Sequence, residues 1–530
     1  MIYEPTPLLW ASILALLFLT WLFIRLMLML IYFAQIKEYR PDRIMSQVRE
    51  SGYFNLLQQY FWWRPAVSVR NILIIIFTIT LTLLGLWVSI ATSKWWEIGA
   101  HKQCLLLNGT LRLTCTYFNA FEHFTPTPSK LAVLSFFWVN ILIVAAHILT
   151  LGGAMFTEPL ARIRRKHLIQ KAHEKITGSN TIYIVISGSY GKTTTKELLY
   201  HILSQKFQVG KTQGNMNTDV GVAISILKNV LPQTQYFIAE VGGYRRGEVA
   251  DATNIFSPTY AIMTPFGNQH LSLYGSRENL VATESEAAEA VGTNGRVYVN
   301  ADIAELPYII NHTRAPITTY SIKSHADIYA TNLVTKNNIS YASISYNGAV
   351  FDITYPLIGE YIVQNLMPAI ALAIDLGMKP DEIQKAISTI KPIPGKLSRH
   401  KGVGESTIIN DSANSSLDGF LNAIAIARKE TGRKIIFATR GIIELGSEKE
   451  TSYQQLLNAL NDVSAILYTT DKLFNKLGTR TQVLTFNKEG SMIDHICKNA
   501  DKNTTIVLEG RLHPNSLKSI IIDGNLQENK

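Results

Sequence analysis

Three long apolar runs are the most extended hydrophobic pattern in the chain. They cover residues 8–33, 71–92 and 131–156. A helix of about 20 apolar residues is long enough to cross a bilayer, so each run predicts a transmembrane helix. No small-residue cleavage site follows the first run, which is therefore interpreted as an anchor and not as a removed signal peptide.

Basic residues near these runs predict an orientation. They are frequent after the first run and in "ARIRRKHLIQK" after the third, and sparser between the second and third runs. Positive charge favours the cytoplasmic side, so the N-terminus is expected outside and the rest of the chain after the third run in the cytoplasm. The expected location is the inner or plasma membrane, multi-pass, with the lipid bilayer as a partner. Cys104 and Cys115 would then face the oxidising side, where they either form a disulfide or remain two free thiols.

The pattern changes to alternating strands and helices from Thr181 onward. "TIYIVIS" is a short strand rich in β-branched residues, and "KTTTKELLYHILSQ" has helical spacing. Residues 325–357 alternate with period two and predict an antiparallel insertion, while the turn-rich "KPIPGKLS" marks a boundary. The prediction is an α/β protein with a membrane module over 1–170, a first α/β domain over 175–393 and a second, doubly wound one over 394–530.

Composition changes this picture little. The formal net charge is +10 over 530 residues, but many of the basic residues flank the apolar runs, where they would contact headgroups. Nucleic acid is therefore not expected as a partner. Three cysteines are too few for a disulfide-based scaffold.

A phosphate-binding loop is predicted where the strand "TIYIVIS" passes into the following helix. The glycines of "GSYGKTTTKE" let backbone N–H groups approach phosphate oxygens, Lys192 supplies a positive charge, and the Thr193 hydroxyl can hold Mg²⁺. The general pattern needs a further glycine where this chain has Ile186. The residues expected to bind ATP in this loop are Gly188, Ser189, Gly191, Lys192, Thr193 and Thr194.

The loop resembles that of the Mur ligases, ATP-dependent amide ligases of cell-wall synthesis, and most of all the member that adds D-Ala-D-Ala to UDP-MurNAc-tripeptide. Other segments resemble the family in the same order along the chain. The resemblance implies a Mur-ligase-like P-loop ATPase central domain and a Rossmann-like C-terminal domain. The matching segments are "GNMNTDVGVAISIL", "YFIAEVGGYRRGEVADA", "IMTPFGNQHLSLYGSRENL", "GEYIVQNLMPAIALAIDLG", "PIPGKLS", "IINDSANSS" and "IIELG".

The resemblance also implies site residues. Glu240 and His270 would bind Mg²⁺ with Thr193, and with Lys192 they would stabilise the transferring phosphoryl group. Further residues are implied on the nucleotide (Asn365 near adenine, Lys396 and Asp411) and on the substrate (Asn215, Asn217 and Asn414).

Glu284 is a departure from the family. The family usually has a lysine there, carbamylated by CO₂, whose anion helps to bind a second metal. We hypothesise that the permanent anion of Glu284 replaces the carbamate and supports a second metal. The alternative is an ordinary acid on a helix surface, with the second metal site lost.

Other departures concern the substrates. Pro265, Tyr361 and Lys396 replace an Asn, a His and an Arg common in the family, and "DSANSSL" keeps only Asp411 and Asn414 of its motif. The identity of the incoming amine, an amino acid or a dipeptide, is therefore open. Nothing between about Thr157 and Thr181 is long enough for the domain that grips the UDP end of the substrate.

The expected function is a membrane-anchored, ATP- and Mg²⁺-dependent amide ligase that acts on a peptidoglycan precursor through an acyl phosphate. The missing domain and the predicted spans together suggest a precursor held at the bilayer, as a lipid-linked muropeptide would be. The alternatives are a ligase of another polymer, such as poly-glutamate, and a weakly active ATP-binding scaffold for cell-wall synthesis.

Overall fold

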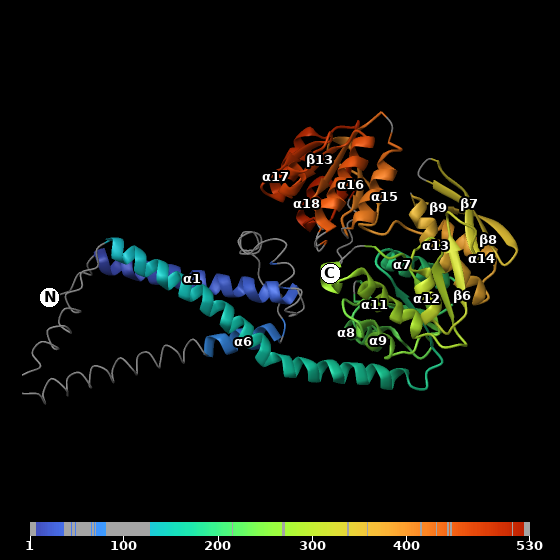
Figure 1. The fold of residues 1–530 in the computed structure, drawn as a ribbon, viewed down its shortest axis with the longest axis horizontal. Helices are drawn as coiled ribbons and strands as arrows, with labels where there is room; N and C mark the ends of the chain where they lie inside the picture. Colours follow the sequence, from blue (N-terminus) through green and yellow to red (C-terminus); the bar gives the residue numbers. More distant parts are fainter. Residues whose placement is uncertain are drawn as a thin grey trace, which may run out of the picture. The chain divides into compact units, whose positions relative to one another are not determined.

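The computed structural model falls into two compact units, Met1–Arg165 and Lys166–Lys530, which are described separately (Figure 1). The first unit contains α1 (Pro7–Ile36), a helical stretch over residues 70–80, and most of the long helix α6 (Pro128–Ile176). The residues that the structure describes are 7–36, 44, 48, 65, 68, 70–80, 128–214, 216–267, 271–336, 339–357, 359–413, 416–430, 432–442, 445, 448–510 and 512–523.

The predicted membrane module is corrected by the helices of the first unit. Among the described residues, none of the helices has the combination of length and apolar character needed to cross a bilayer. α1 includes the buried Arg25, and α6 continues past residue 156 into a charged segment with a Glu158–Arg162 ion pair.

The prediction of three transmembrane helices over 8–33, 71–92 and 131–156 is therefore wrong, and so is the multi-pass membrane location. The lipid-linked substrate and the bilayer partner were inferred from those spans and lose their basis. Cys104 and Cys115 lie outside the described residues, so their pairing stays a prediction.

A nine-stranded sheet forms the first half of the second unit. Its strand order is β2-β3-β1-β4-β5-β6-β7-β8-β9, parallel through β7 and antiparallel from β7 to β9. The antiparallel strands occupy the segment in which period-two alternation predicted them. The strands are β1 (Ile182–Ser187), β2 (Val209–Lys211), β3 (Tyr236–Glu240), β4 (Tyr260–Met263), β5 (Arg296–Asn300), β6 (Ile317–Ser321), β7 (Ile328–Lys336), β8 (Ile339–Tyr346) and β9 (Ala349–Tyr355).

Helices cover both faces of this sheet, and alternate residues of β1 point to opposite cores. Ile184 and Ile186 belong to one cluster, while Tyr183 and Val185 belong to the other, as the period of a strand requires. A central parallel strand is buried on both faces, which is why "IYIVIS" is apolar at nearly every position. The helices are α7 (Lys192–Leu203), α8 (Asp219–Asn229), α9 (Glu248–Thr253), α10 (Leu271–Tyr274), α11 (Arg277–Glu289), α12 (Leu306–His312), α13 (Glu360–Asp375) and α14 (Pro380–Ser388).

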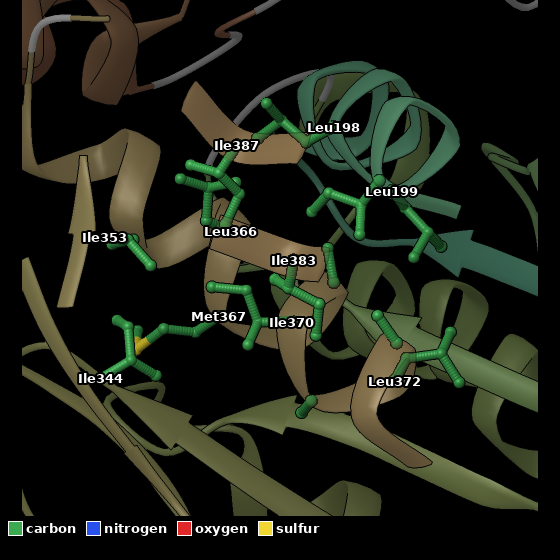
Figure 2. Close-up of a cluster of buried hydrophobic side chains, with 14 of the residues drawn as sticks. Leu198, Leu199, Ile344, Ile353, Leu366, Met367, Ile370, Leu372, Ile383 and Ile387 are labelled. Atoms are coloured by element: carbon green, nitrogen blue, oxygen red, sulfur yellow. The ribbon is translucent and has the colours of Figure 1, made fainter. Parts of the chain in front are cut away.

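The first of these cores joins α7, α13 and α14 to the sheet. Figure 2 shows Leu198 and Leu199 of α7 near Leu366, Met367 and other apolar side chains of α13 and α14. This packing fixes α7, whose N-terminus follows the predicted phosphate loop, against α13, which carries Asn365. The second core contains α8, α9 and α11 together with Ala172 near the end of α6.

A six-stranded sheet forms the second half of this unit (Figure 1, orange to red). Its order is β10-β11-β15-β12-β13-β14, with only β10 antiparallel to its neighbour. Its elements are β10 (Ser398–Lys401), η1 (Val403–Glu405), β11 (Thr407–Asp411), α15 (Leu417–Ala427), β12 (Lys434–Thr439), α16 (Lys449–Asp462), β13 (Ile466–Thr469), η3 (Lys472–Lys476), β14 (Gln482–Thr485), α17 (Glu489–Asn499), β15 (Thr504–Glu509) and α18 (Pro514–Ile520).

The mixed α/β architecture agrees with the sequence prediction for this part of the chain. The boundaries at 170, 175, 393 and 394 stay predictions.

Candidate active site

The predicted phosphate loop lies between the end of β1 and the first turn of α7. Gly188 has a φ of 125°, and a Cβ atom there would lie 2.3 Å from the Thr264 hydroxyl, so only glycine fits. The backbone N–H of Ser189 donates to the carbonyl of Pro265 at 3.0 Å, and Thr194 is buried. The loop is therefore held against the segment that follows β4.

Gly191 is the N-cap of α7 and has a φ of 88°. A Cβ atom there would lie 2.5 Å from Asn365 Oδ1. We expect Gly191→Ala to lower the free energy of unfolding by about 1–3 kcal/mol, since it combines a left-handed backbone with this clash. Chemical denaturation measures the change. Gly178→Ala is the matched control, because Gly178 has a φ of 81° with no atom within 4 Å of the added Cβ; an equal loss in both variants would contradict the Asn365 contact.

Lys192 opens α7 and turns back over the loop. Its ammonium group donates to the carbonyl of Gly188 and lies 3.9 Å from Glu284 Oε1. The Lys192 side chain is 14% exposed, so the charge is shielded but reachable. A cation in this position can neutralise charge on a phosphate bound by the loop.

Glu284 projects from α11 beneath the loop and is 2% exposed. It accepts hydrogen bonds from Ser187 Oγ at 2.5 Å, from the Gly188 N–H at 3.0 Å and from the Tyr274 hydroxyl at 2.7 Å. Burial, and after it the charge of Glu284, raise the pKa of Tyr274 well above its ordinary value, so this hydroxyl keeps its proton. This degree of burial does not fit the alternative of an ordinary helix-surface acid.

Glu240 ends β3 beside the start of α7. The Thr193 hydroxyl donates to Glu240 Oε1 at 3.0 Å, and the ammonium of Lys196 lies 2.9 Å from Oε2. A carboxylate and a hydroxyl are the hard oxygen ligands that Mg²⁺ prefers, so these two residues fit the predicted metal. Within the described part of the chain, no group of three or more His, Cys, Asp or Glu side chains is arranged to hold a metal. His270 lies outside that part.

Asn365 of α13 is buried next to the loop. Its Oδ1 accepts from the Thr195 hydroxyl at 3.1 Å, and its Nδ2 donates to the Tyr361 carbonyl at 2.9 Å. Asn365 thus fixes α13 to the first turn of α7. It also lines a small cavity of about 70 Å³ together with Tyr190 and Asp411.

A larger cavity of about 450 Å³ lies next to the small one. Thr194, Tyr361 and Lys396 line both cavities. The larger one is also bordered by basic side chains, namely Arg399, His400 and Lys401. The predicted nucleotide residues of the two α/β halves, Asn365, Lys396 and Asp411, therefore lie around one connected region.

Asp411 and Glu509 form a buried acid pair where β11 and β15 end side by side. Burial raises the pKa of Asp411, against the lowering effect of the Lys396 charge. Burial, and next the charge of Asp411, raise the pKa of Glu509 well above its ordinary 4.5. We infer that Glu509 keeps its proton and donates a hydrogen bond to Asp411.

The acid pair predicts a pH dependence of stability. Because the folded protein binds more protons here than the unfolded chain, the stabilisation present at low pH is lost as the pH rises through the folded pKa. Glu509→Gln keeps the hydrogen bond but cannot ionise. We therefore expect its melting temperature to fall less than that of the unchanged protein between about pH 5 and pH 8. Thermal melts at several pH values test this, and parallel curves would contradict it.

The predicted substrate residues are only partly described. A Cβ atom on Gly242 would lie 3.6 Å from both Asn217 Nδ2 and Lys192 Nζ, so Asn217 lies close to the phosphate loop. Asn215 and Asn414 lie outside the described residues, and their roles stay predictions.

Comparison with known proteins finds a matching family for the central part of the chain. The family described as "Mur ligase middle domain" matches residues 186–373, which include the phosphate loop, Glu240, Glu284 and Asn365. The UDP-N-acetylmuramoyl-tripeptide--D-alanyl-D-alanine ligases of Escherichia coli (strain K12) and Bacillus subtilis (strain 168) are 27% and 28% identical to this chain. Residues 186–373 therefore carry a Mur ligase middle domain.

These two relatives match only part of the chain. The alignments cover 52% and 54% of this chain and 60% and 62% of the relatives, so the chain spans about three fifths of their length. Among solved structures, MurF from Acinetobacter baumannii superposes with a TM-score of 0.62 at 23% identity, covering 67% of this chain and 80% of that one. MurF from Thermotoga maritima in complex with ADP superposes with a TM-score of 0.60 at 22% identity, covering 66% of this chain and 80% of that one. Both structures support the fold.

Sequence reasoning missed four residues of this candidate site. Ser187 and Tyr274 bond Glu284, Glu509 pairs with Asp411, and Lys196 pairs with Glu240. Of these four, only Lys196 could have been found from the sequence. It lies four residues after Lys192 on the same predicted helix, and therefore on the same face, close to the loop.

Proposed function

We propose that this protein is an ATP-dependent amide ligase that joins an amine to a carboxyl group of a cell-wall peptide precursor. The observation that carries the proposal is the position of Lys192, whose ammonium group lies over the phosphate loop between the Gly188 carbonyl and Glu284. A phosphate-binding loop with a fixed cation is what phosphoryl transfer from ATP requires.

The proposed reaction has two steps. The substrate carboxylate attacks the γ-phosphorus of ATP, which releases ADP and leaves an acyl phosphate. The amine nitrogen then attacks the acyl carbon, expels phosphate and gives up a proton to solvent. Lys192 and the backbone N–H groups of the loop would stabilise the charge on the transferring group.

Thr193 and Glu240 are the described residues that would hold Mg²⁺, with His270 as the further predicted ligand. A bound Mg²⁺ would neutralise charge on the phosphate oxygens. Glu240 is oriented for this from β3, because its Oε1 faces the Thr193 hydroxyl.

Glu284 would supply a permanent anion where the family has a carbamylated lysine. Its buried position and its bonds to Ser187 and Gly188 support a role in setting the shape of the loop and the position of Lys192. Its part in a second metal site stays a proposal.

The nucleotide would extend from the loop toward Asn365, Tyr361 and Lys396. The two adjoining cavities near these residues support this placement, and Lys396, which lines both, adds a positive charge. Asp411 would contact the nucleotide from the C-terminal sheet.

The names of the relatives suggest the substrates: UDP-MurNAc-tripeptide as the acid and D-Ala-D-Ala as the amine. The test is phosphate release from ATP with the acid alone, the amine alone, and both together. We expect release only with both. Turnover with glutamate in place of the dipeptide would favour a poly-glutamate type of ligase, and no release with any pair would favour a scaffold.

A further inference from the structure

Lys196 is a buried cation that the proposed reaction does not use directly. It lies in the second turn of α7, and its side chain is fully buried. Lysine is almost never fully buried unless its charge is paired. The contacts of its ammonium group therefore indicate what it is for.

The ammonium of Lys196 joins two segments that are distant in sequence. It lies 2.9 Å from Glu240 Oε2, at the end of β3. It also donates to the carbonyl of Gly214 at 2.8 Å, in the loop between β2 and α8. A more distant contact, 3.9 Å, reaches the neighbouring Glu197.

The loop over residues 212–218, here called the β2–α8 loop, is tied to Glu240 in two further places. The Glu240 N–H donates to the Thr212 hydroxyl at 3.0 Å, and the Gly242 N–H donates to the Asn217 carbonyl at 3.1 Å. The loop is thus bonded to the backbone before and after the Glu240 side chain. Lys196 adds the only one of these three ties that involves the Glu240 carboxylate.

We infer that Lys196 is a positioning residue that couples the Glu240 carboxylate to the β2–α8 loop. By holding Oε2, it leaves Oε1 directed at Thr193, where the proposed metal would bind. By holding the Gly214 carbonyl, it keeps the loop and Asn217 close to Lys192. The inference rests on the proposed role of Glu240, but its structural part concerns the protein without ligands.

Hydrogen exchange of the ligand-free protein tests the coupling to the loop. We expect Lys196→Met to increase the exchange of peptides covering the β2–α8 loop by about 10-fold or more, because a loop that loses a bond opens locally. Lys211→Met is the matched control, since Lys211 lies on β2 just before the loop and its ammonium group pairs with Glu197 and lies over the Tyr200 ring, with no bond to the loop among the contacts described. In the Lys211→Met variant, peptides covering the β2–α8 loop should exchange at the rate of the unchanged protein.

A double variant that removes both charges separates the coupling of Lys196 to the β2–α8 loop from a general effect on protein stability. Lys196→Met alone leaves the Glu240 charge buried without its partner, which can unfold the protein. Lys196→Met combined with Glu240→Gln removes both charges. We expect this double variant to fold and its β2–α8 loop still to exchange fast. Slow exchange, as in the unchanged protein, would overturn the inference.

The dependence on Mg²⁺ tests the coupling to the carboxylate. We expect Lys196→Met to raise the Mg²⁺ concentration for half-maximal ATP hydrolysis by about 10-fold or more, as loss of a residue supporting a metal ligand does. Lys196→Arg, which keeps the charge, should recover part of this shift. An unchanged Mg²⁺ dependence would overturn the coupling of Lys196 to the Glu240 carboxylate. If the protein has no ATP hydrolysis at all, the proposed function fails, while the exchange experiment still decides the coupling to the loop.

Discussion

Lys192→Met is expected to lower ATP hydrolysis by about 100- to 1000-fold, the loss typical of removing one group that stabilises developing charge. Methionine has nearly the length of lysine but no ammonium group to lie between the Gly188 carbonyl and Glu284. The measurement is the phosphate release rate at saturating ATP and both co-substrates.

Lys206→Met is the control for the Lys192 variant. Lys206 follows α7 and forms an exposed ion pair with Glu382, away from the loop. The Lys206→Met variant should keep the phosphate release rate of the unchanged protein. Thermal melts should show that both variants are folded. A Lys192→Met protein that turns over at the unchanged rate would contradict the proposed role of Lys192 in phosphoryl transfer.

Glu284→Gln is expected to lower activity by about 100-fold, the loss that a displacement of about 1 Å in a reacting group can cause. The amide NH₂ of glutamine would face groups that now donate to Glu284, namely both Ser187 Oγ and the Gly188 N–H in one orientation, or the Tyr274 hydroxyl in the other. Leaving such a buried donor unpaired also costs about 1–3 kcal/mol of stability. Rate and denaturation are measured together. Glu278→Gln, in the exposed first turn of the same helix, is the control and should change neither.

The same residue predicts an indifference to CO₂. Because the Glu284 anion is permanent, the unchanged protein should keep its rate in CO₂-depleted buffer. A fall in rate that bicarbonate restores would show that a carbamate is still needed, and would contradict the replacement hypothesis.

Local patterns explain why part of the fold and site could be predicted. The strand "TIYIVIS", the glycines and the helix after them are consecutive in sequence, so β1, the loop and α7 follow from periodicity and turn chemistry. Glu240 could be found because a polar residue ends an apolar strand. The alternation over residues 325–357 predicted the antiparallel strands β7, β8 and β9 for the same reason.

Contacts between distant segments explain what could not be predicted. Ser187 and Glu284 are separated by 97 positions, and Thr195 and Asn365 by 170. No local pattern records such a pair, so the partners of Glu284 and the second role of Asn365 were missed. Glu509 was missed because its pairing with Asp411 depends on the register of β11 against β15.

The predicted spans failed for a different reason. Apolar run length alone was taken as evidence of a span, whereas none of the described helices meets the requirements of length and apolar character together. In the first unit, Met27 and Ile31 of α1 pack with Ile74 of the second run, and Leu26 and Met29 pack with Ala146 of the third.

The phosphate loop is held in shape from outside its own segment. Glu284 of α11 bonds its first glycine, and Asn365 of α13 contacts its last. Transplanting residues 185–199 into another parallel sheet would therefore carry over the glycines and the lysine without the conformation that makes them useful. A designer would need to graft three segments, from β1 to α7, from α11 and from α13, to obtain the same loop.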